Sequence, residues 1–121
     1  MATTAPSIPP AAEAVAKHRS LAESFQATVA ARGDAVALRT PDDGVSITFA
    51  EYGRRVEQIA RGLHASGVGA RDTVAILLTN RPEFHLVDTA TIHLGATPFS
   101  MYNTLAPEQI AHLYGNAQPK V

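Results

Sequence analysis

One helical segment followed closely by a short apolar run constrains the fold of this chain most tightly. Thr48 and Glu51 have the spacing of a helix capping box, and apolar side chains recur at helical intervals behind it: Phe49, Tyr52, Val56, Ile59, Ala60 and Leu63. The run TVAILL over residues 73–78 then suits a parallel strand that is covered on both faces. An amphipathic helix that leads into a buried strand predicts an α/β fold.

The residues before this helix predict a second helix and a β-hairpin. Ser20 and Glu23 repeat the capping-box spacing, so a helix is expected over residues 21–31, with Gly33 in a left-handed conformation after it. A hairpin is expected over residues 35–47. Its tight turn contains four residues that fix or tolerate turn conformations: Pro41, Asp42, Asp43 and Gly44.

The alternation of helices and strands continues toward the C-terminus. A helix is expected over residues 82–94, a strand over 97–102 and a short helix over 107–116. Residues 117–121 resemble the approach to another strand. We therefore predict an α/β fold with a partial, mostly parallel sheet that is flanked by helices, an N-terminal hairpin and an incomplete sheet edge.

Composition and charge narrow the function classes. Ten Lys plus Arg and eleven Asp plus Glu give a net charge of -1, so no broad positive field favours nucleic acid as a partner. The sequence has no cysteine, which excludes Cys-based metal sites here and fits a cytoplasmic protein. Residues 1–19 resemble a flexible lead-in rather than a secretory signal. No stretch is apolar enough to cross a bilayer, so any membrane contact is expected to be peripheral.

Three residues on one expected helix have the types found in metal sites: His85, Asp88 and His93. At 100° per residue, His85 and Asp88 are neighbours, but His93 lies well round the helix from Asp88. No HExxH pattern is present. We interpret all three as surface or packed side chains. The remaining histidines are isolated and are expected to be structural or solvated: His18, His64 and His112.

Two further patterns invite a comparison with ligand-binding motifs. The run Gly67-Val68-Gly69 contains half of a dinucleotide-binding fingerprint, but it follows a helix instead of a strand, so we expect it to end that helix. The triplet Tyr102-Asn103-Thr104 follows an expected strand end, where open α/β sheets bind ligands. We interpret it as a turn and helix entry, in which Asn103 or Thr104 bonds free helix amides. The alternative is a role in lining a site.

The segments ITFAEY, GVGARDTVAILLTNRPEF and HLGATPFSMYNTLAPEQIAHL resemble the amino-terminal region of the AMP-forming acyl-CoA synthetases. The resemblance covers about 100 of the 121 residues. Within it, TPFSMYNTLAPEQIAHL is most similar to bacterial long-chain fatty-acid CoA ligases. The resemblance implies that residues 20–121 are an incomplete N-terminal portion of an AMP-binding (adenylation) domain.

For the parent enzyme the resemblance implies a two-step ligation. A fatty-acid carboxylate attacks the α-phosphorus of ATP, pyrophosphate leaves, and coenzyme A (CoA) then displaces AMP, with Mg²⁺ neutralising the phosphates. The family's phosphate loop, its Tyr-Gly-x-Thr-Glu segment, its ribose-binding Asp and its C-terminal catalytic Lys have no match here. We therefore assign no catalytic, cofactor-binding or metal-ligating residue to this chain, and we expect the chain alone to be inactive and without cofactors.

Two alternatives stay open. In the first alternative, the chain is a free-standing α/β interaction module without catalysis. An in-frame stop codon after Val121 in the gene would favour this alternative. A small nucleotide-binding or receiver-like domain is a weaker alternative, because no glycine loop joins a strand to a helix and no acidic cluster follows the strands.

Overall fold

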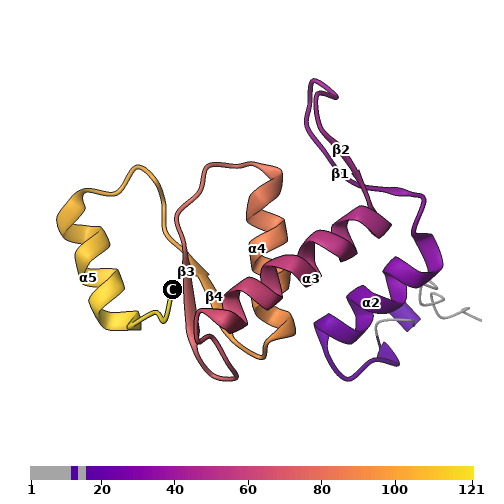
Figure 1. Cartoon of the computed structure of the whole chain (residues 1–121). Coiled ribbons are helices and arrows are strands. Elements are labelled where there is room, and N and C mark those ends of the chain that lie inside the picture. Colours follow the sequence, from indigo (N-terminus) through magenta and orange to yellow (C-terminus); the bar gives the residue numbers. More distant parts are fainter. Residues whose placement is uncertain (1–11, 14–15) are drawn as a thin grey trace, which may run out of the picture.

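The computed structural model describes residues 12–13 and 16–121 (Figure 1). The expected lead-in lies largely outside these residues, so that prediction is not tested. The elements in chain order are α2 (Leu21–Arg32), β1 (Val36–Arg39), β2 (Ser46–Thr48), α3 (Phe49–Ala65), β3 (Thr73–Ile76), α4 (Pro82–His93), β4 (Thr97–Ser100) and α5 (Pro107–Ala117). This mixture of helices and small sheets confirms the α/β prediction.

Helices α2 and α3 begin at the side chains that the sequence indicated. The Ser20 hydroxyl accepts a hydrogen bond from the Glu23 amide at 3.1 Å, and the Thr48 hydroxyl accepts one from the Glu51 amide at 3.2 Å. Each bond satisfies an amide that has no partner inside the helix. The Glu23 carboxylate bonds the Arg19 amide at 3.3 Å, one residue before the cap. The predicted helix starts are therefore correct, although the Glu23 side chain bonds a different amide from the one expected.

Helix α3 ends in a Schellman turn. Gly67 has a φ of 98°, its amide donates to the His64 carbonyl at 3.0 Å, and the Val68 amide donates to the Leu63 carbonyl at 3.0 Å. The buried Val68 side chain then packs against Leu63. The prediction that the glycine run ends the helix is confirmed.

Strands β1 and β2 form the predicted hairpin as an antiparallel pair with an irregularity between Val36 and Leu38. The turn is closed by Asp42, whose carboxylate accepts bonds from the Thr40 hydroxyl at 2.6 Å and the Gly44 amide at 3.1 Å. These two bonds, the first more than the second, lower the pKa of Asp42. The hairpin is a separate sheet from the β3–β4 pair.

Strands β3 and β4 form a parallel pair, and the end of the chain approaches the other edge of β3. The Lys120 amide donates to the Thr73 carbonyl at 2.8 Å, and the Ala75 amide donates to the Val121 carbonyl at 2.9 Å. Both segments advance in the same direction, as in parallel pairing. Residues 117–121 were expected to lead into another strand; they form no strand in the structure, although Lys120 and Val121 make these two bonds to β3. Pro98 lies opposite Val74 in the β3–β4 pair.

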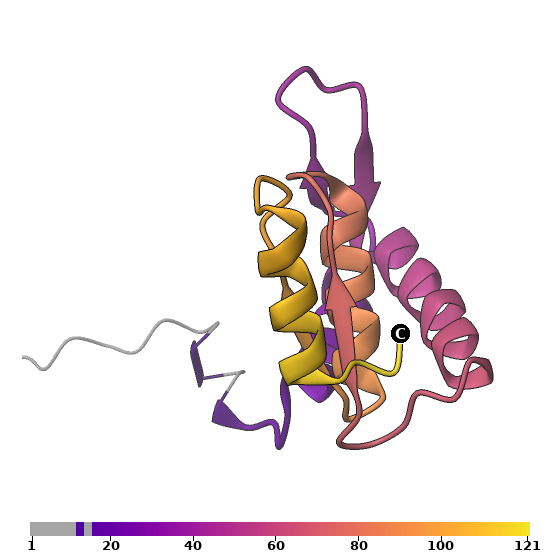
Figure 2. The ribbon, with the colours of Figure 1, turned by 90° about the vertical axis from the view of Figure 1, so that its left-hand side faces the viewer.

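The strands are shorter and less covered than expected. Strand β3 ends at Ile76, and Leu77 is 46% exposed. Helix α4 lies on one side of the β3–β4 pair and α5 on the other (Figures 1 and 2), but no α5 side chain is buried. The prediction that residues 73–78 are covered on both faces is therefore wrong in the described part of the chain, because α5 stands away from the sheet.

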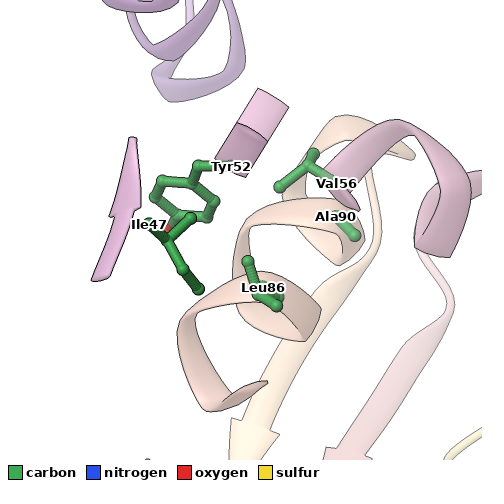
Figure 3. Close-up of a cluster of buried hydrophobic side chains, with 5 residues drawn as sticks. All are labelled: Ile47, Tyr52, Val56, Leu86 and Ala90. Atoms are coloured by element: carbon green, nitrogen blue, oxygen red, sulfur yellow. The ribbon is translucent and has the colours of Figure 1, made fainter. Parts of the chain in front are cut away.

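The main core joins the hairpin to α3 and α4 (Figure 3). Its buried side chains are Ile47, Tyr52, Val56, Leu86 and Ala90. The Tyr52 hydroxyl donates to the His85 carbonyl at 3.1 Å and lies 2.6 Å from the Thr89 hydroxyl. Burial raises the pKa of Tyr52, and the nearby Asp88 adds to the effect. A second cluster of Val68, Val74 and Ala96 lies under the β3–β4 pair.

Glycines allow α2 and α3 to approach one another. A Cβ atom at Gly53 of α3 would lie 3.0 Å from Val29 Cγ1 of α2, and one at Gly33, just after α2, would lie 3.6 Å from Ala50 Cβ of α3. The expectation of a left-handed Gly33 is wrong, because its φ is -50°.

We predict that Gly53→Val lowers the free energy of unfolding by about 1–3 kcal/mol, because the new methyl groups meet Val29. The matched control is Gly62→Val in the same helix, where a Cβ would have no neighbour within 4 Å. This control should be neutral or slightly stabilising, since valine has the higher helix propensity. Equal losses for the two variants in denaturant titrations would contradict the packing argument.

We predict that Tyr52→Phe lowers the free energy of unfolding at pH 7 by about 1 kcal/mol, because Thr89 and the His85 carbonyl lose a partner. Tyr102→Phe is the control, since Tyr102 is 77% exposed. A raised pKa favours the neutral phenol in the folded state, so this stability is present below the ordinary value of 10.0 and is lost as the pH rises above it. Thermal unfolding should therefore show a smaller alkaline loss for Tyr52→Phe than for the unmodified protein.

Candidate functional site

The carboxyl ends of β3 and β4 open into a hollow of about 380 Å³. Its walls come from the residues after β3, the start of α4 and the residues after β4. The chain leaves β3 toward α4 on one side of the sheet and leaves β4 toward α5 on the other side (Figures 1 and 2). Neighbouring strands whose connections diverge in this way form the crevice where open α/β sheets bind ligands. This hollow is therefore the candidate site.

The lining of the hollow combines apolar walls with neutral polar groups. Leu78, Phe84 and Met101 supply apolar surface, and Met101 is fixed because its amide donates to the Ile76 carbonyl at 2.9 Å. The ring of Phe84 meets His85 edge to face at 5.7 Å. Polar atoms come from Thr79, Asn80, Ser100, Tyr102 and Asn103.

The chemistry of the hollow is that of a binding surface. None of its lining residues is Asp, Glu, Lys or Arg. General acid–base catalysis needs titratable groups, and only the His85 and Tyr102 side chains could serve. An ion pair lies beside the hollow at the start of α4, with Arg81 Nε 2.8 Å from Glu83 Oε2. The arginine lowers the pKa of Glu83, and both side chains are exposed.

The structure corrects the expected role of the Tyr102-Asn103-Thr104 triplet. The triplet is an exposed turn, in which the Tyr102 carbonyl accepts from the Leu105 amide at 3.2 Å. Helix α5 begins later, and its entry is stabilised by Gln109 Oε1, which accepts from the Ala106 amide at 2.9 Å. The prediction of a cap by Asn103 or Thr104 is therefore wrong. The Gln three residues after Ala106 was the available signal.

Asn103 and Tyr102 do line the hollow, which agrees with the alternative that the sequence left open. Asn80 and His85 join them from the other strand end and from α4. No spacing rule indicated these two residues, because they reach the hollow only through the parallel pairing of β3 with β4. Whether any of these side chains contacts a ligand stays a prediction.

The two histidines among the residues that resembled a metal cluster have different surroundings. His93 Nδ1 donates to the Thr89 carbonyl at 2.7 Å, and His93 Nε2 lies 3.0 Å from Gln26 Nε2. His85 instead lines the hollow. Across residues 12–13 and 16–121, no group of three or more His, Asp or Glu residues is arranged to hold a metal ion. The assignment of no catalytic, cofactor-binding or metal-ligating residue stays a prediction.

Residues 25–121 match the family described as AMP-binding enzymes. The chain is 43% identical over 102 residues to the uncharacterized protein Rv1549 of Mycobacterium tuberculosis, covering 84% of this chain and 58% of that protein. It is 30% identical over 109 residues to the long-chain-fatty-acid–CoA ligase heimdall of Drosophila melanogaster, covering 85% of this chain and 16% of the ligase.

Solved structures show the same fold. A protein described as a long-chain-fatty-acid CoA ligase from Rhodopseudomonas palustris matches with a TM-score of 0.77 and 32% identity over 83% of this chain and 25% of its own. The N-terminal domain of FACL13 from Mycobacterium tuberculosis matches with a TM-score of 0.81 and 22% identity over 86% of this chain and 26% of its own. The chain thus spans little more than half of Rv1549 and a quarter of the Rhodopseudomonas ligase. In the part that the structure describes, no helix has the length and apolar character to cross a bilayer.

Proposed function

Because this chain belongs to the family of AMP-binding enzymes, we propose that it supplies N-terminal scaffold to a ligase that joins a long-chain fatty acid to CoA. The observation that carries this proposal is the Rhodopseudomonas match, which combines 32% identity with the same fold over 83% of the chain. The heimdall ligase, 30% identical over 109 residues, favours the same acyl substrate class.

The proposed reaction is adenylation of the fatty-acid carboxylate by ATP, followed by thioester formation with CoA. The whole enzyme would use ATP, Mg²⁺ and CoA in the cytoplasm, with any membrane contact peripheral. The hollow at the ends of β3 and β4 does not suit a magnesium–triphosphate, because it has no lining Asp, Glu, Lys or Arg. We therefore assign residues 20–121 to the scaffold of the adenylation domain and no chemical step to their side chains.

The first test uses the chain by itself. With ATP, Mg²⁺ and palmitate, the purified chain should release no pyrophosphate above a protein-free blank, because no side chain is assigned to bind the triphosphate. A coupled pyrophosphate assay measures this. Turnover above the blank would contradict the scaffold assignment.

The second test asks whether the chain can act as scaffold for the chemistry. Residues 25–121 would replace the matching segment of the Rhodopseudomonas ligase, and the chimaera would be assayed for acyl-CoA formation with palmitate. We expect activity within about tenfold of that ligase, since a modest misplacement of distant groups already costs rate. The matched control carries Val56→Asp, which places a charge in the core and should abolish activity. A folded chimaera without activity would instead favour the interaction-module alternative.

A further inference from the structure

The turn of the hairpin contains two neighbouring residues that can react with each other. Asp43 is followed by Gly44, and Asp43 is the only aspartate in the sequence that precedes a glycine. Because glycine has no side chain, a carboxyl group on the preceding residue reaches its amide nitrogen with little hindrance. The turn lies at the outer end of the hairpin, away from the helices (Figures 1 and 2). The Asp43 side chain is 72% exposed there, so water reaches it freely.

Three other aspartates are less able to react in this way. The amide after Asp34 belongs to Ala35 and donates to the Arg32 carbonyl at 3.0 Å. Asp88 lies inside α4, where the backbone amides bond within the helix. The Asp72 carboxylate already accepts a hydrogen bond from a backbone amide at 2.8 Å. Asp43 therefore has the most accessible neighbouring amide among these residues.

A side chain, and not the backbone, holds the Gly44 amide in place. This amide donates to the Asp42 carboxylate at 3.1 Å, and among the described residues it has no backbone acceptor. The same Asp42 oxygen accepts from the Thr40 hydroxyl at 2.6 Å. The bond from Thr40, more than the bond from Gly44, lowers the pKa of Asp42, so this carboxylate stays charged in mildly acidic solution. The bond to Asp42 restrains the rotation by which the Gly44 nitrogen approaches Asp43.

The other contacts of Asp43 restrain it only weakly. Arg39 Nε lies 3.3 Å from Asp43 Oδ1, and both side chains are exposed. Exposed ion pairs of this kind contribute little, so the Asp43 carboxyl group stays available. The φ of Asp43 is 55°, a left-handed conformation that is unfavourable for residues other than glycine. Rotation of Asp43 out of this conformation therefore relieves backbone strain.

We propose that Asp43 is a site of spontaneous isoaspartate formation, and that the Asp42 side chain slows this reaction by holding the Gly44 amide. First, the Gly44 nitrogen bonds Asp43 Cγ, while the amide proton and the hydroxyl group of the protonated Asp43 carboxyl leave as water. The product is a cyclic imide. Water then adds to the former backbone carbonyl of Asp43 and breaks its bond to the Gly44 nitrogen. The main chain now runs through the former side chain, and neither oxidant nor reductant is consumed.

The product changes the hairpin turn and exposes a new chemical group. It adds one methylene to the backbone between Thr40 and Val45, whose amide and carbonyl close the turn at 3.0 Å. The former backbone carbonyl of Asp43 becomes a free carboxylate on an exposed turn. Such a group is the substrate of methyltransferases that recognise isoaspartate. The chemical class of partner for this site is therefore a carboxyl methyltransferase that uses S-adenosylmethionine.

The test ages the full 121-residue chain for several weeks at body temperature in mildly acidic solution. An isoaspartyl methyltransferase with labelled S-adenosylmethionine measures the isoaspartate formed, and peptide mapping with electron-transfer fragmentation locates it. We expect label to accumulate at Asp43 before it appears at Asp34, Asp72 or Asp88. Label spread evenly over the aspartates would overturn the proposal.

Three variants test the role of each group. Asp42→Ala should form isoaspartate at Asp43 about fivefold faster, the factor that corresponds to one net hydrogen bond. Thr40→Val is the matched control, because it removes a hydroxyl from the same turn but leaves the Asp42 carboxylate to hold the Gly44 amide. It should change the rate much less. Gly44→Ala should lose most of the label, because the added methyl group shields the nitrogen.

Circular dichroism confirms that each variant is folded before rates are compared. The φ of Gly44 lies outside the left-handed region, so alanine is compatible with the backbone there. The proposal is overturned if Asp42→Ala ages no faster than the unmodified chain, if Thr40→Val accelerates the reaction as much as Asp42→Ala, or if Gly44→Ala retains the full label.

Discussion

The contacts of the Tyr52 side chain hold the helices and the hairpin of this chain in their relative positions. Its ring lies in the core with Ile47 from the hairpin, and it meets the Phe25 ring of α2 edge to face at 4.8 Å. Its hydroxyl bonds two residues of α4, the His85 carbonyl and the Thr89 hydroxyl. One side chain of α3 therefore joins α2, the core residue Ile47 of the hairpin and α4. Because β3 connects α3 to α4, fixing these helices also fixes where the strand ends and where the hollow opens.

Local signals in the sequence predicted local structure well. Ser20, Thr48 and Gly67 act at helix ends through bonds to residues within a turn of themselves, so their spacing alone was informative. Contacts between distant segments were not predictable in this way. Gly33 was expected to be left-handed, but its φ is -50°, whereas Gly53, which no local pattern singled out, is the glycine of α3 that meets Val29 of α2.

The same limit applies to the candidate site. Tyr102 and Asn103 were noticed because they follow an expected strand, but Asn80 and His85 reach the hollow from another strand end and from α4. The lengths of the strands were overestimated because an apolar run does not reveal which of its residues have neighbours on both faces. Leu77 belongs to such a run and is 46% exposed, since α5 stands away from it.

Because Pro98 lies in β4, the two outer edges of the parallel pair differ in how well they can form backbone hydrogen bonds with a strand of another polypeptide. The amides of Thr97 and Met101 donate to β3, so the intervening proline falls where an amide would point outward, and its missing N–H costs no bond within the pair. A strand from another polypeptide that paired with the outer edge of β4 would find no backbone N–H donor at Pro98. On the opposite edge of β3, Lys120 and Val121 already bond Thr73 and Ala75. These bonds set the alignment that any further backbone pairing along this edge would follow. Association through backbone pairing is thus directional: it is discouraged beside β4 and guided beside β3.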